Sequence, residues 1–180
     1  MNTESGYQRI AVVGTTGSGK TTLAHRLAHR LDIPHVELDA LHWGPDWIPV
    51  PTAIFRERIA RALSGRQWVV DGNYGKVRDI VWGRADTVVW LDYALPVVVG
   101  RLLWRTLRRV VTREELWSGN REGVRGTLSH DSILLWALRT YWRRRREYPA
   151  LFASPEHAHL TVMRLRSPRA TGDWLSSLTQ

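Results

Sequence analysis

Residues 9–21 read Arg-Ile-Ala-Val-Val-Gly-Thr-Thr-Gly-Ser-Gly-Lys-Thr, and this stretch decides the fold. The run from Arg9 to Val13 is short and apolar, which is typical of a buried strand. The segment from Gly14 to Thr21 matches the pattern Gly-x-x-x-x-Gly-Lys-Ser/Thr without exception. An amphipathic helix is expected next, from about Lys20 to Leu31, because its leucines share one face. A strand, a glycine-rich loop and a helix in this order predict a phosphate-binding site.

The residue types in this loop explain how it would bind phosphate. Glycines let successive backbone N–H groups point inward at phosphate oxygens, and the new helix adds its positive dipole end. Lys20 can reach the terminal phosphates of ATP, and the Thr21 hydroxyl can ligate Mg²⁺. The alternative is an ordinary glycine-rich turn, but one of only two lysines in the chain stands where the pattern requires it. The predicted nucleotide-binding residues of the loop are Gly14, Thr15, Gly17, Ser18, Gly19, Lys20, Thr21 and Thr22.

The composition limits the class of protein. The chain has 180 residues, of which 43% are hydrophobic and 24% charged, as in globular domains. It contains no cysteine, which excludes disulfides and thiolate metal sites. No apolar run approaches the roughly 18 residues of a membrane span, and a signal-peptide pattern is absent, so we expect a cytoplasmic protein without a membrane partner. We predict a single domain over residues 1–180, with a lid inserted at about 112–130.

Strand-like and helix-like segments alternate along the rest of the chain. Further strands are predicted at residues 35–38, 67–71, 87–91 and 160–165, and further helices at 52–64, 96–111, 131–147 and 168–180. The stretch 39–51 contains three prolines and two tryptophans and is predicted to be an ordered loop. This alternation predicts an α/β protein with a parallel sheet covered by helices on both faces.

Three aspartates stand at the ends of predicted strands, where ligands of open α/β sheets bind. We predict that Asp71 holds Mg²⁺ through water, because an apolar strand ends in it. Asp92 is the alternative metal carboxylate, and a turn or helix-capping role is the preferred interpretation for it. Asp39 is predicted to accept the proton of an attacking hydroxyl or to orient that hydroxyl, and a structural role stays equally open.

Two aromatic residues follow Asp39 closely. His42 and Trp43 would lie beside its carboxylate, with Trp47 nearby. Tryptophan offers a flat surface on which a planar acceptor can stack. For each tryptophan singly, however, packing of the loop onto the sheet is the preferred interpretation. The predicted acceptor-binding residues therefore include Asp39, His42 and Trp43.

The net charge of +9 comes almost entirely from arginine, and half of the arginines lie between residues 101 and 146. Positions 101, 105 and 108 recur at helical spacing and form one basic stripe. Phosphoryl transfer needs cations around the transferring group and exclusion of water, so this region predicts a basic lid. Arg105, Arg113 and Arg121 are predicted to neutralise charge during catalysis, together with Lys20. The alternative for any one arginine is a solvated helix face.

A second group of arginines, Arg143 to Arg146, is interpreted differently. Four consecutive residues point all round a helix, so they cannot all face one ligand. We predict that they form a solvated helix end that complements the helix dipole. Contact with nucleic acid is the alternative.

With these features in place, the chain resembles the adenylate-kinase-like group of P-loop kinases, and more closely the branch labelled DNA topology modulation proteins. The resemblance rests on Leu38-Asp39-Ala40-Leu41-His42-Trp43, Pro45-Asp46-Trp47, Trp68-Val69-Val70-Asp71-Gly72-Asn73-Tyr74, Ala85-Asp86-Thr87, Leu91-Asp92 and Leu165-Arg166-Ser167-Pro168. It implies a P-loop NTPase three-layer sandwich with five parallel strands in the order 2-3-1-4-5 and a helical, arginine-rich lid. It also implies that Arg101 and Arg105 grip ATP and that Arg78 binds a phosphate of the acceptor. The sequence departs from adenylate kinases after Gly72, where Asn73-Tyr74-Gly75 replaces Phe-Pro-Arg.

The resulting hypothesis is an ATP- and Mg²⁺-dependent kinase, similar to nucleoside monophosphate kinases, that phosphorylates a small acceptor. The alternative from another class is a nucleotide-dependent regulator that binds nucleic acid through its arginines. A hydrolase with water as acceptor is a further alternative, but water needs no pocket as elaborate as the segment 39–47.

Overall fold

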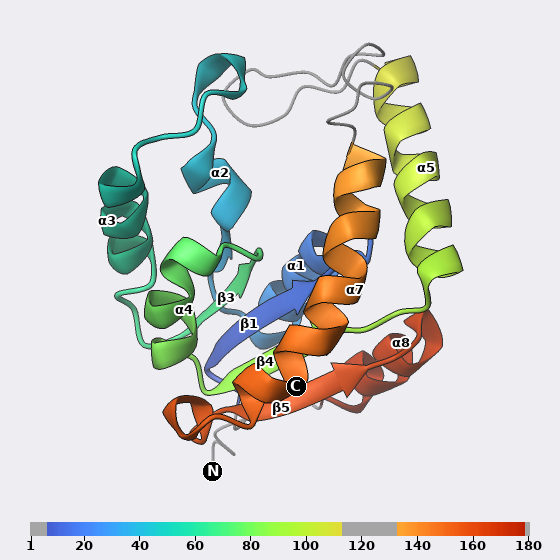
Figure 1. Cartoon of the computed structure of the whole chain (residues 1–180). Coiled ribbons are helices and arrows are strands. Elements are labelled where there is room, and N and C mark those ends of the chain that lie inside the picture. The colour runs from blue at the N-terminus through green and yellow to red at the C-terminus, as the bar shows by residue number, and fades with distance from the viewer. Residues whose placement is uncertain (1–6, 113–132, 179–180) are drawn as a thin grey trace.

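The computed structural model describes residues 7–112 and 133–178 (Figure 1). Five strands, β1 (Arg9–Gly14), β2 (His35–Glu37), β3 (Trp68–Asp71), β4 (Thr87–Leu91) and β5 (Thr161–Leu165), form one sheet. Every pairing is parallel and the order is β2-β3-β1-β4-β5, which confirms the predicted fold class and strand order. The helices are α1 (Lys20–Leu31), α2 (Leu38–His42), α3 (Thr52–Ala62), α4 (Arg78–Arg84), α5 (Leu95–Thr112), α7 (Ile133–Phe152) and α8 (Pro168–Ser177).

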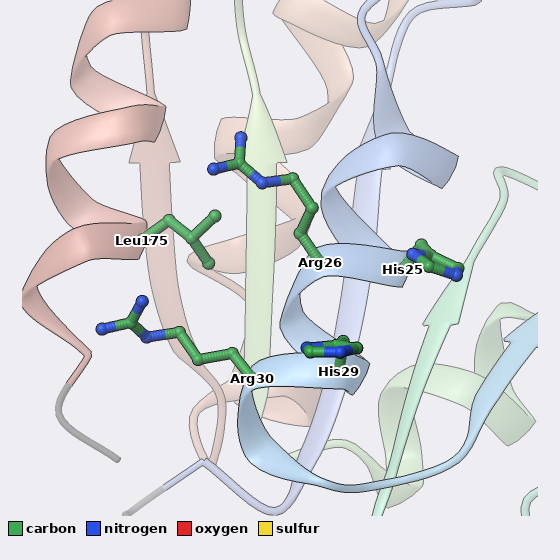
Figure 2. Close-up of a pocket in the computed structure, with 5 residues that line it drawn as sticks. All are labelled: His25, Arg26, His29, Arg30 and Leu175. Carbon is green, nitrogen blue, oxygen red and sulfur yellow. The ribbon is translucent and has the colours of Figure 1, made fainter.

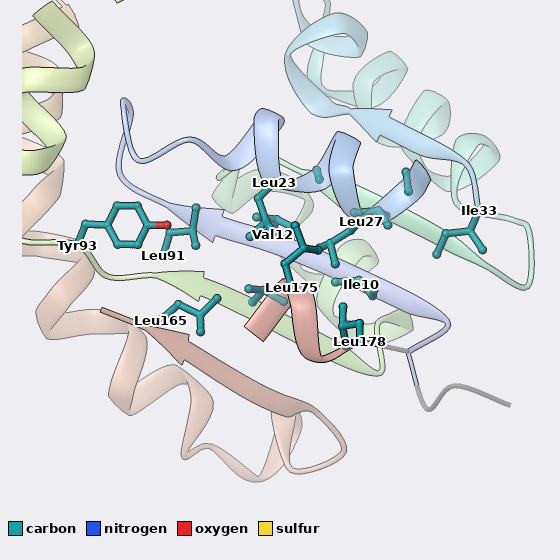
Figure 3. Close-up of a cluster of buried hydrophobic side chains, with 14 of the residues drawn as sticks. Ile10, Val12, Leu23, Leu27, Ile33, Leu91, Tyr93, Leu165, Leu175 and Leu178 are labelled. Atoms are coloured by element: carbon teal, nitrogen blue, oxygen red, sulfur yellow. The ribbon is translucent and has the colours of Figure 1, made fainter. Parts of the chain in front are cut away.

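The sheet is the middle of three layers because its central strands are apolar on both faces. Successive side chains of β1 point to opposite faces. Ile10 and Val12 join a core with α1 and α8 (Figure 3), whereas Ala11 and Val13 join a second core with α3, α4 and the end of α7. All of β3 and β4 is buried as well. Strands covered on both faces are expected to be continuous apolar runs, as these are.

The segment after β2 differs from the prediction. The strand ends at Glu37, and the predicted loop 39–51 contains the helix α2 and a 3₁₀ helix at Pro45–Trp47. Leu38 is 2% exposed and packs against Gly72, so closely that a Cβ on that glycine would lie 2.7 Å from the Leu38 Cβ. The need to bury this leucine against the chain after β3 turns the backbone out of the sheet. Asp39 therefore lies on a helix.

The helix α7 also differs from the prediction. It continues past the predicted end at residue 147 to Phe152, with Pro149 in its last turn. Tyr148 and Phe152 pack against Trp82 and Trp90, with ring centroids 5.0–5.8 Å apart. This aromatic cluster holds the last turn in place although proline cannot donate a helical hydrogen bond. The arginine run 143–146 thus lies inside a helix, and the predicted solvated helix end is wrong.

The two longest helices in the described segments, α5 and α7, pack against each other on one side of the molecule, and α2 and α3 lie on the other (Figure 1). No helix in residues 7–112 or 133–178 is long and apolar enough to cross a bilayer. The predicted lid at about 112–130 lies almost wholly outside the described residues, as do Arg113 and Arg121.

Candidate functional site

The predicted phosphate loop connects β1 to α1, and its glycines are required by backbone geometry. Gly17 and Gly19 have φ angles of 86° and 92°, in the left-handed region that disfavours other residues. A Cβ on Gly17 would lie 2.9 Å from the Leu102 Cβ, so the loop also packs directly on α5. Gly19 precedes α1 and supplies no side-chain cap, which leaves the first N–H groups of the helix for a ligand.

Lys20 begins α1 inside this loop, and its amine is buried among charges of both signs. Loss of hydration, followed by repulsion from Arg144, lowers the pKa of the amine to about 8, although Asp71 and Asp39 oppose the shift. The Nζ atom donates to the Thr15 carbonyl at 3.3 Å. The buried Ser18 hydroxyl has no hydrogen-bond partner within the described part of the chain. An anion bound in the loop would stabilise the charged form of the Lys20 amine and accept a hydrogen bond from the Ser18 hydroxyl, so these residues fit a nucleotide phosphate.

The predicted metal residues meet at the end of β3. The Thr21 hydroxyl donates to Asp71 Oδ2 at 2.7 Å, and His35 Nε2 lies 2.8 Å from Asp71 Oδ1. Mg²⁺ in phosphoryl-transfer sites is held by one or two side chains, waters and substrate phosphates. A hydroxyl and a carboxylate beside a phosphate loop fit this pattern. His35 was not predicted, because the register that brings β2 beside β3 is a property of the tertiary structure.

Asp92 has a different role from the turn or helix-capping role that was preferred from the sequence. Its side chain is 1% exposed and pairs with two arginines, Arg145 at 2.7 Å and Arg164 at 2.6 Å. Both carboxylate oxygens are occupied by these guanidinium groups. The preferred turn or capping interpretation is therefore wrong, since the carboxylate joins α7 and β5 to the end of β4. Because both oxygens are bound by cationic guanidinium groups that already neutralise the carboxylate, Asp92 is a poor candidate for the metal.

Arg144 is a functional candidate that sequence reasoning missed. It lies on the buried face of α7 and is only 7% exposed. Its guanidinium contacts the Thr140 hydroxyl at 3.3 Å and the Tyr148 side chain, and neither carries negative charge. Burial lowers the pKa of Arg144 and raises that of Tyr148. Among the charges that act on Lys20, Arg144 has the largest influence, ahead of the opposing charges of Asp71 and Asp39.

The helix α5 supplies two of the predicted arginines. Arg101 Nη1 donates to the Ser18 carbonyl at 3.1 Å, and its guanidinium lies 5.4 Å from the centre of the Tyr93 ring. Arg105 is partly buried, and its positive charge acts on Lys20. The structure thus brings both arginines of the predicted pair to the phosphate loop.

The predicted acceptor residues form a separate group on α2. The Tyr74 hydroxyl donates to Asp39 Oδ1, and burial followed by the charge of Asp39 raises the pKa of that phenol. The His42 ring lies 4.5–4.8 Å from the rings of Tyr74, Phe55 and Trp43, and burial lowers its pKa. These contacts are those expected if the rings pack the segment together. Asp39 is close enough to influence the pKa of Lys20.

Arg78 lies at a small cavity between the segment that follows β3 and α4. The cavity has a volume of about 20 Å³, and its lining includes Gly72, Asn73, Arg78, Trp82 and Tyr148. The guanidinium of Arg78 lies over the Trp82 ring, 5.1 Å from its centre.

Asn73 joins this cavity to the phosphate loop. Its Oδ1 accepts from the Gly14 N–H at 3.1 Å, and its Nδ2 donates to the Gly14 carbonyl at 2.6 Å. The Tyr148 hydroxyl donates to the same Oδ1 at 3.1 Å. Because β3 ends at Asp71 while β1 continues to Gly14, the side-chain amide satisfies backbone groups that a longer strand would have paired. The chain can thus leave the sheet at Gly72 and open the cavity.

A larger depression, of about 260 Å³, lies away from the phosphate loop. It is lined by His25, Arg26, His29 and Arg30 of α1 and by Leu175 of α8 (Figure 2). Arg30 donates to the carbonyls of Leu178 and Ser176, which fastens the end of α8 onto α1. No residue of the loop lines this depression, so its size does not make it the candidate active site.

No family model matches the chain, and no curated protein matches its sequence. Solved structures do match its fold. Shikimate kinase from Bacteroides thetaiotaomicron superposes with a TM-score of 0.55 at 14% identity, over 95% of this chain and 96% of that one. The chain has the fold of the P-loop kinases. Shikimate kinase from Acinetobacter baumannii in complex with shikimate has a TM-score of 0.55 at 19% identity, over 96% of this chain and 90% of that one. A gluconokinase from Sinorhizobium meliloti 1021 has a TM-score of 0.51 at 21% identity, over 95% of this chain and 93% of that one. At these identities the similarity to P-loop kinases concerns the fold alone.

Proposed function

We propose that the protein is an ATP-dependent kinase that transfers the γ-phosphoryl group to a small acceptor. One observation carries this proposal: the buried amine of Lys20 lies in the glycine-rich loop, and the positive charge of the buried Arg144 acts on it. A triphosphate chain bound in the loop would supply negative charge to both cations. The fold of small-molecule kinases supports the same assignment. The adenylate-kinase-like branch, the DNA topology modulation group and a cytoplasmic location rest on the sequence alone.

On the donor side, each group would act by binding or neutralising phosphate. Loop amides and Lys20 would hold the β- and γ-phosphates, while Arg101 would grip the nucleotide from α5. Thr21 and Asp71 would hold Mg²⁺, which supplies charge neutralisation when bound. Arg105 and Arg144 would stabilise charge on the transferring group. Arg113 and Arg121 keep their predicted lid role as part of this proposal.

On the acceptor side, Asp39 would orient the attacking hydroxyl and take its proton. The Tyr74 hydroxyl donates to Asp39 Oδ1, and because its pKa is raised it stays a neutral donor. This hydrogen bond fixes the orientation of the carboxylate and leaves Oδ2 to act on the hydroxyl of the acceptor. Arg78, beside Trp82, would bind an anionic group of the acceptor. His42 and Trp43 complete the proposed acceptor side. The class of acceptor that fits best is a small hydroxyl compound with a carboxylate or phosphate group.

The decisive experiment is a screen for acceptors. Purified protein with Mg·ATP is incubated with nucleoside monophosphates, nucleosides, hydroxy acids and sugar acids, and release of ADP is measured. We expect at least one anionic hydroxyl compound to raise ADP release well above the rate without acceptor, and Lys20→Ala to remove the increase. If no acceptor raises ADP release above the Lys20→Ala variant, the kinase assignment is wrong.

A second candidate is a nucleotide-dependent regulator that binds nucleic acid. The observation in its favour is that Trp104 of α5 and Trp136 and Trp142 of α7 are exposed, on helices that also present exposed arginines. Aromatic rings among cations can stack on bases. Binding to nucleic acid that weakens steeply with salt would support this function, whereas acceptor-dependent ADP release supports the kinase.

Nucleotide binding should take up protons at pH 8. With a pKa of about 8, roughly half of the Lys20 amines are neutral in the free protein at that pH. A bound triphosphate favours the charged amine and raises its pKa, so about half a proton should enter per nucleotide at pH 8, more at pH 9 and almost none at pH 6. Calorimetric titrations of Mg·ATP in two buffers of different ionisation enthalpy measure this number.

The matched control for that titration is Lys20→Arg. A guanidinium keeps the positive charge but does not titrate in this range, so the pH-dependent uptake should disappear. Equal uptake by both proteins, or release of protons at pH 8, would show that Lys20 is not the responsible group.

A further inference from the structure

His35 is a partly buried group that the proposed reaction does not use directly. It is the first residue of β2, at the edge of the sheet, and pairs with Val69 two residues before Asp71. Its ring lies on the α1 side of the sheet, with its centroid 6.4 Å from that of His25 in an edge-on arrangement. The side chains of His35 and Asp71 are 14% and 6% exposed. The histidine is therefore held between α1 and the carboxylate.

The hydrogen bond to Asp71 has a defined direction. An ionised carboxylate can only accept, so the Nε2–H of His35 donates to Oδ1 at 2.8 Å. Thr21 donates to the other oxygen, Oδ2, at 2.7 Å. Both oxygens are thus restrained, which fixes the rotation of the carboxylate about its side-chain bonds. In such a poorly hydrated place, each of these bonds is stronger than it would be in water.

The two restraints differ in their relation to the proposed metal. The Thr21 hydroxyl is itself a proposed Mg²⁺ ligand, and it could keep donating its O–H to Asp71 while an oxygen lone pair bound the metal. His35 would make no bond to the metal and would act through its hydrogen bond to Asp71 alone. Replacing a residue that orients a metal ligand typically lowers metal affinity by about 10- to 100-fold.

We propose that His35 is a positioning residue that holds Asp71 in the orientation required to bind Mg²⁺ with nucleotide. This inference rests on the proposed function for the identity of the metal site, but it concerns binding and needs no acceptor. His35 touches neither the metal nor the nucleotide in this arrangement; it acts through Asp71.

The test compares two replacements of His35. Leucine removes the donor and keeps an apolar side chain of similar reach, whereas glutamine keeps an N–H group that can donate to the carboxylate. Affinity for Mn²⁺ in the presence of ADP is measured by electron paramagnetic resonance, and affinity for ADP without metal by calorimetry. We expect His35→Leu to weaken Mn²⁺ binding by about 10- to 100-fold with unchanged metal-free ADP binding, and His35→Gln to stay within a few-fold of the original protein.

Two controls exclude a purely structural role. His25→Leu removes the neighbouring ring and should leave Mn²⁺ affinity unchanged. In the Asp71→Asn background, His35→Leu should cause no further loss, because the residue acts only through that carboxylate. If His35→Leu does not fold, His35→Asn, which keeps a polar side chain but is too short to reach Asp71, takes its place with the same expected loss.

Several outcomes would overturn the proposal. These are an Mn²⁺ affinity of the leucine variant within two-fold of the original, an equal loss in the glutamine and leucine variants, or a parallel loss of metal-free ADP binding. Failure of the kinase assignment looks different: the original protein would bind Mn²⁺ and ADP, yet no acceptor would raise ADP release.

Discussion

Replacing Arg144 with methionine is expected to lower phosphoryl transfer by roughly 10³-fold or more, by analogy with the loss of an arginine at a transferring phosphate. The side chain is 7% exposed, and its hydrogen bonds within residues 7–112 and 133–178 are to the neutral hydroxyl groups of Thr140 and Tyr148, so burying this cation costs free energy in the free protein. Methionine has a similar length and fills the same space without that cost. The free protein should therefore be as stable as before, or more stable, while it loses activity.

The matched control is Arg143→Met on the same helix. Arg143 is exposed and pairs with Glu147 at 3.8 Å, so its replacement should leave the rate nearly unchanged. The measurements are acceptor-dependent ADP release and thermal unfolding of both variants. Equal rates for the two variants, or a large loss of stability in Arg144→Met, would show that Arg144 supports the fold rather than the reaction.

Replacing Asp92 with asparagine should have the opposite effect: the protein should lose stability and keep its activity. The carboxylate is 1% exposed and neutralises Arg145 and Arg164, which are 34% and 36% exposed. Breaking a buried pair costs about 3–5 kcal/mol, and since both arginines can regain water we expect about 3 kcal/mol. For a chain of this size that corresponds to a fall in Tm of roughly 6–12 °C. Calorimetric unfolding measures it, and activity below the transition should persist.

Two other aspartates calibrate this result. Asp79 pairs with Arg56 on the surface at 2.6 Å, and Asp79→Asn should change Tm far less than Asp92→Asn does. Asp71→Asn should keep the fold but lose the Mg²⁺ dependence of activity. If Asp92→Asn instead weakened metal binding without lowering Tm, Asp92 rather than Asp71 would be the metal carboxylate.

The features that sequence reasoning predicted correctly are local ones. The strand at residues 9–14, the loop at 14–21 and the helix from Lys20 depend on neighbouring residues, whose backbone preferences and apolar spacing are visible in the chain itself. The parallel sheet also followed from alternating segments, although its order 2-3-1-4-5 was an expectation from the family resemblance. The same resemblance implied that Arg101 and Arg105 grip ATP. The structure brings Arg101 to the Ser18 carbonyl and Arg105 close enough to act on Lys20, and the grip on ATP stays a prediction.

The errors arose where a distant contact outweighed the local pattern. The helix was predicted to end at residue 147, after the arginine run, but packing of Tyr148 and Phe152 on two tryptophans extends it. This extension turns Arg144 from a solvated residue into a buried one. Helix α4 and the helical turn at Asp39 were missed because each is short and is stabilised by contacts outside itself.

By itself, the sequence determined that residues 14–21 form a phosphate loop between a strand and a helix, because a glycine-rich turn with a following lysine encodes its conformation and charge within eight residues. Only the tertiary structure decided which groups surround that loop. The docking of α7 brings the charge of Arg144 close to Lys20, and the register of β2 on β3 brings His35 to Asp71. Two arginines, from α7 and β5, pair with Asp92. Each of these residues lies 36 or more positions along the chain from the group it influences. Such contacts form only when helices dock and strands pair, so the local sequence pattern does not reveal them.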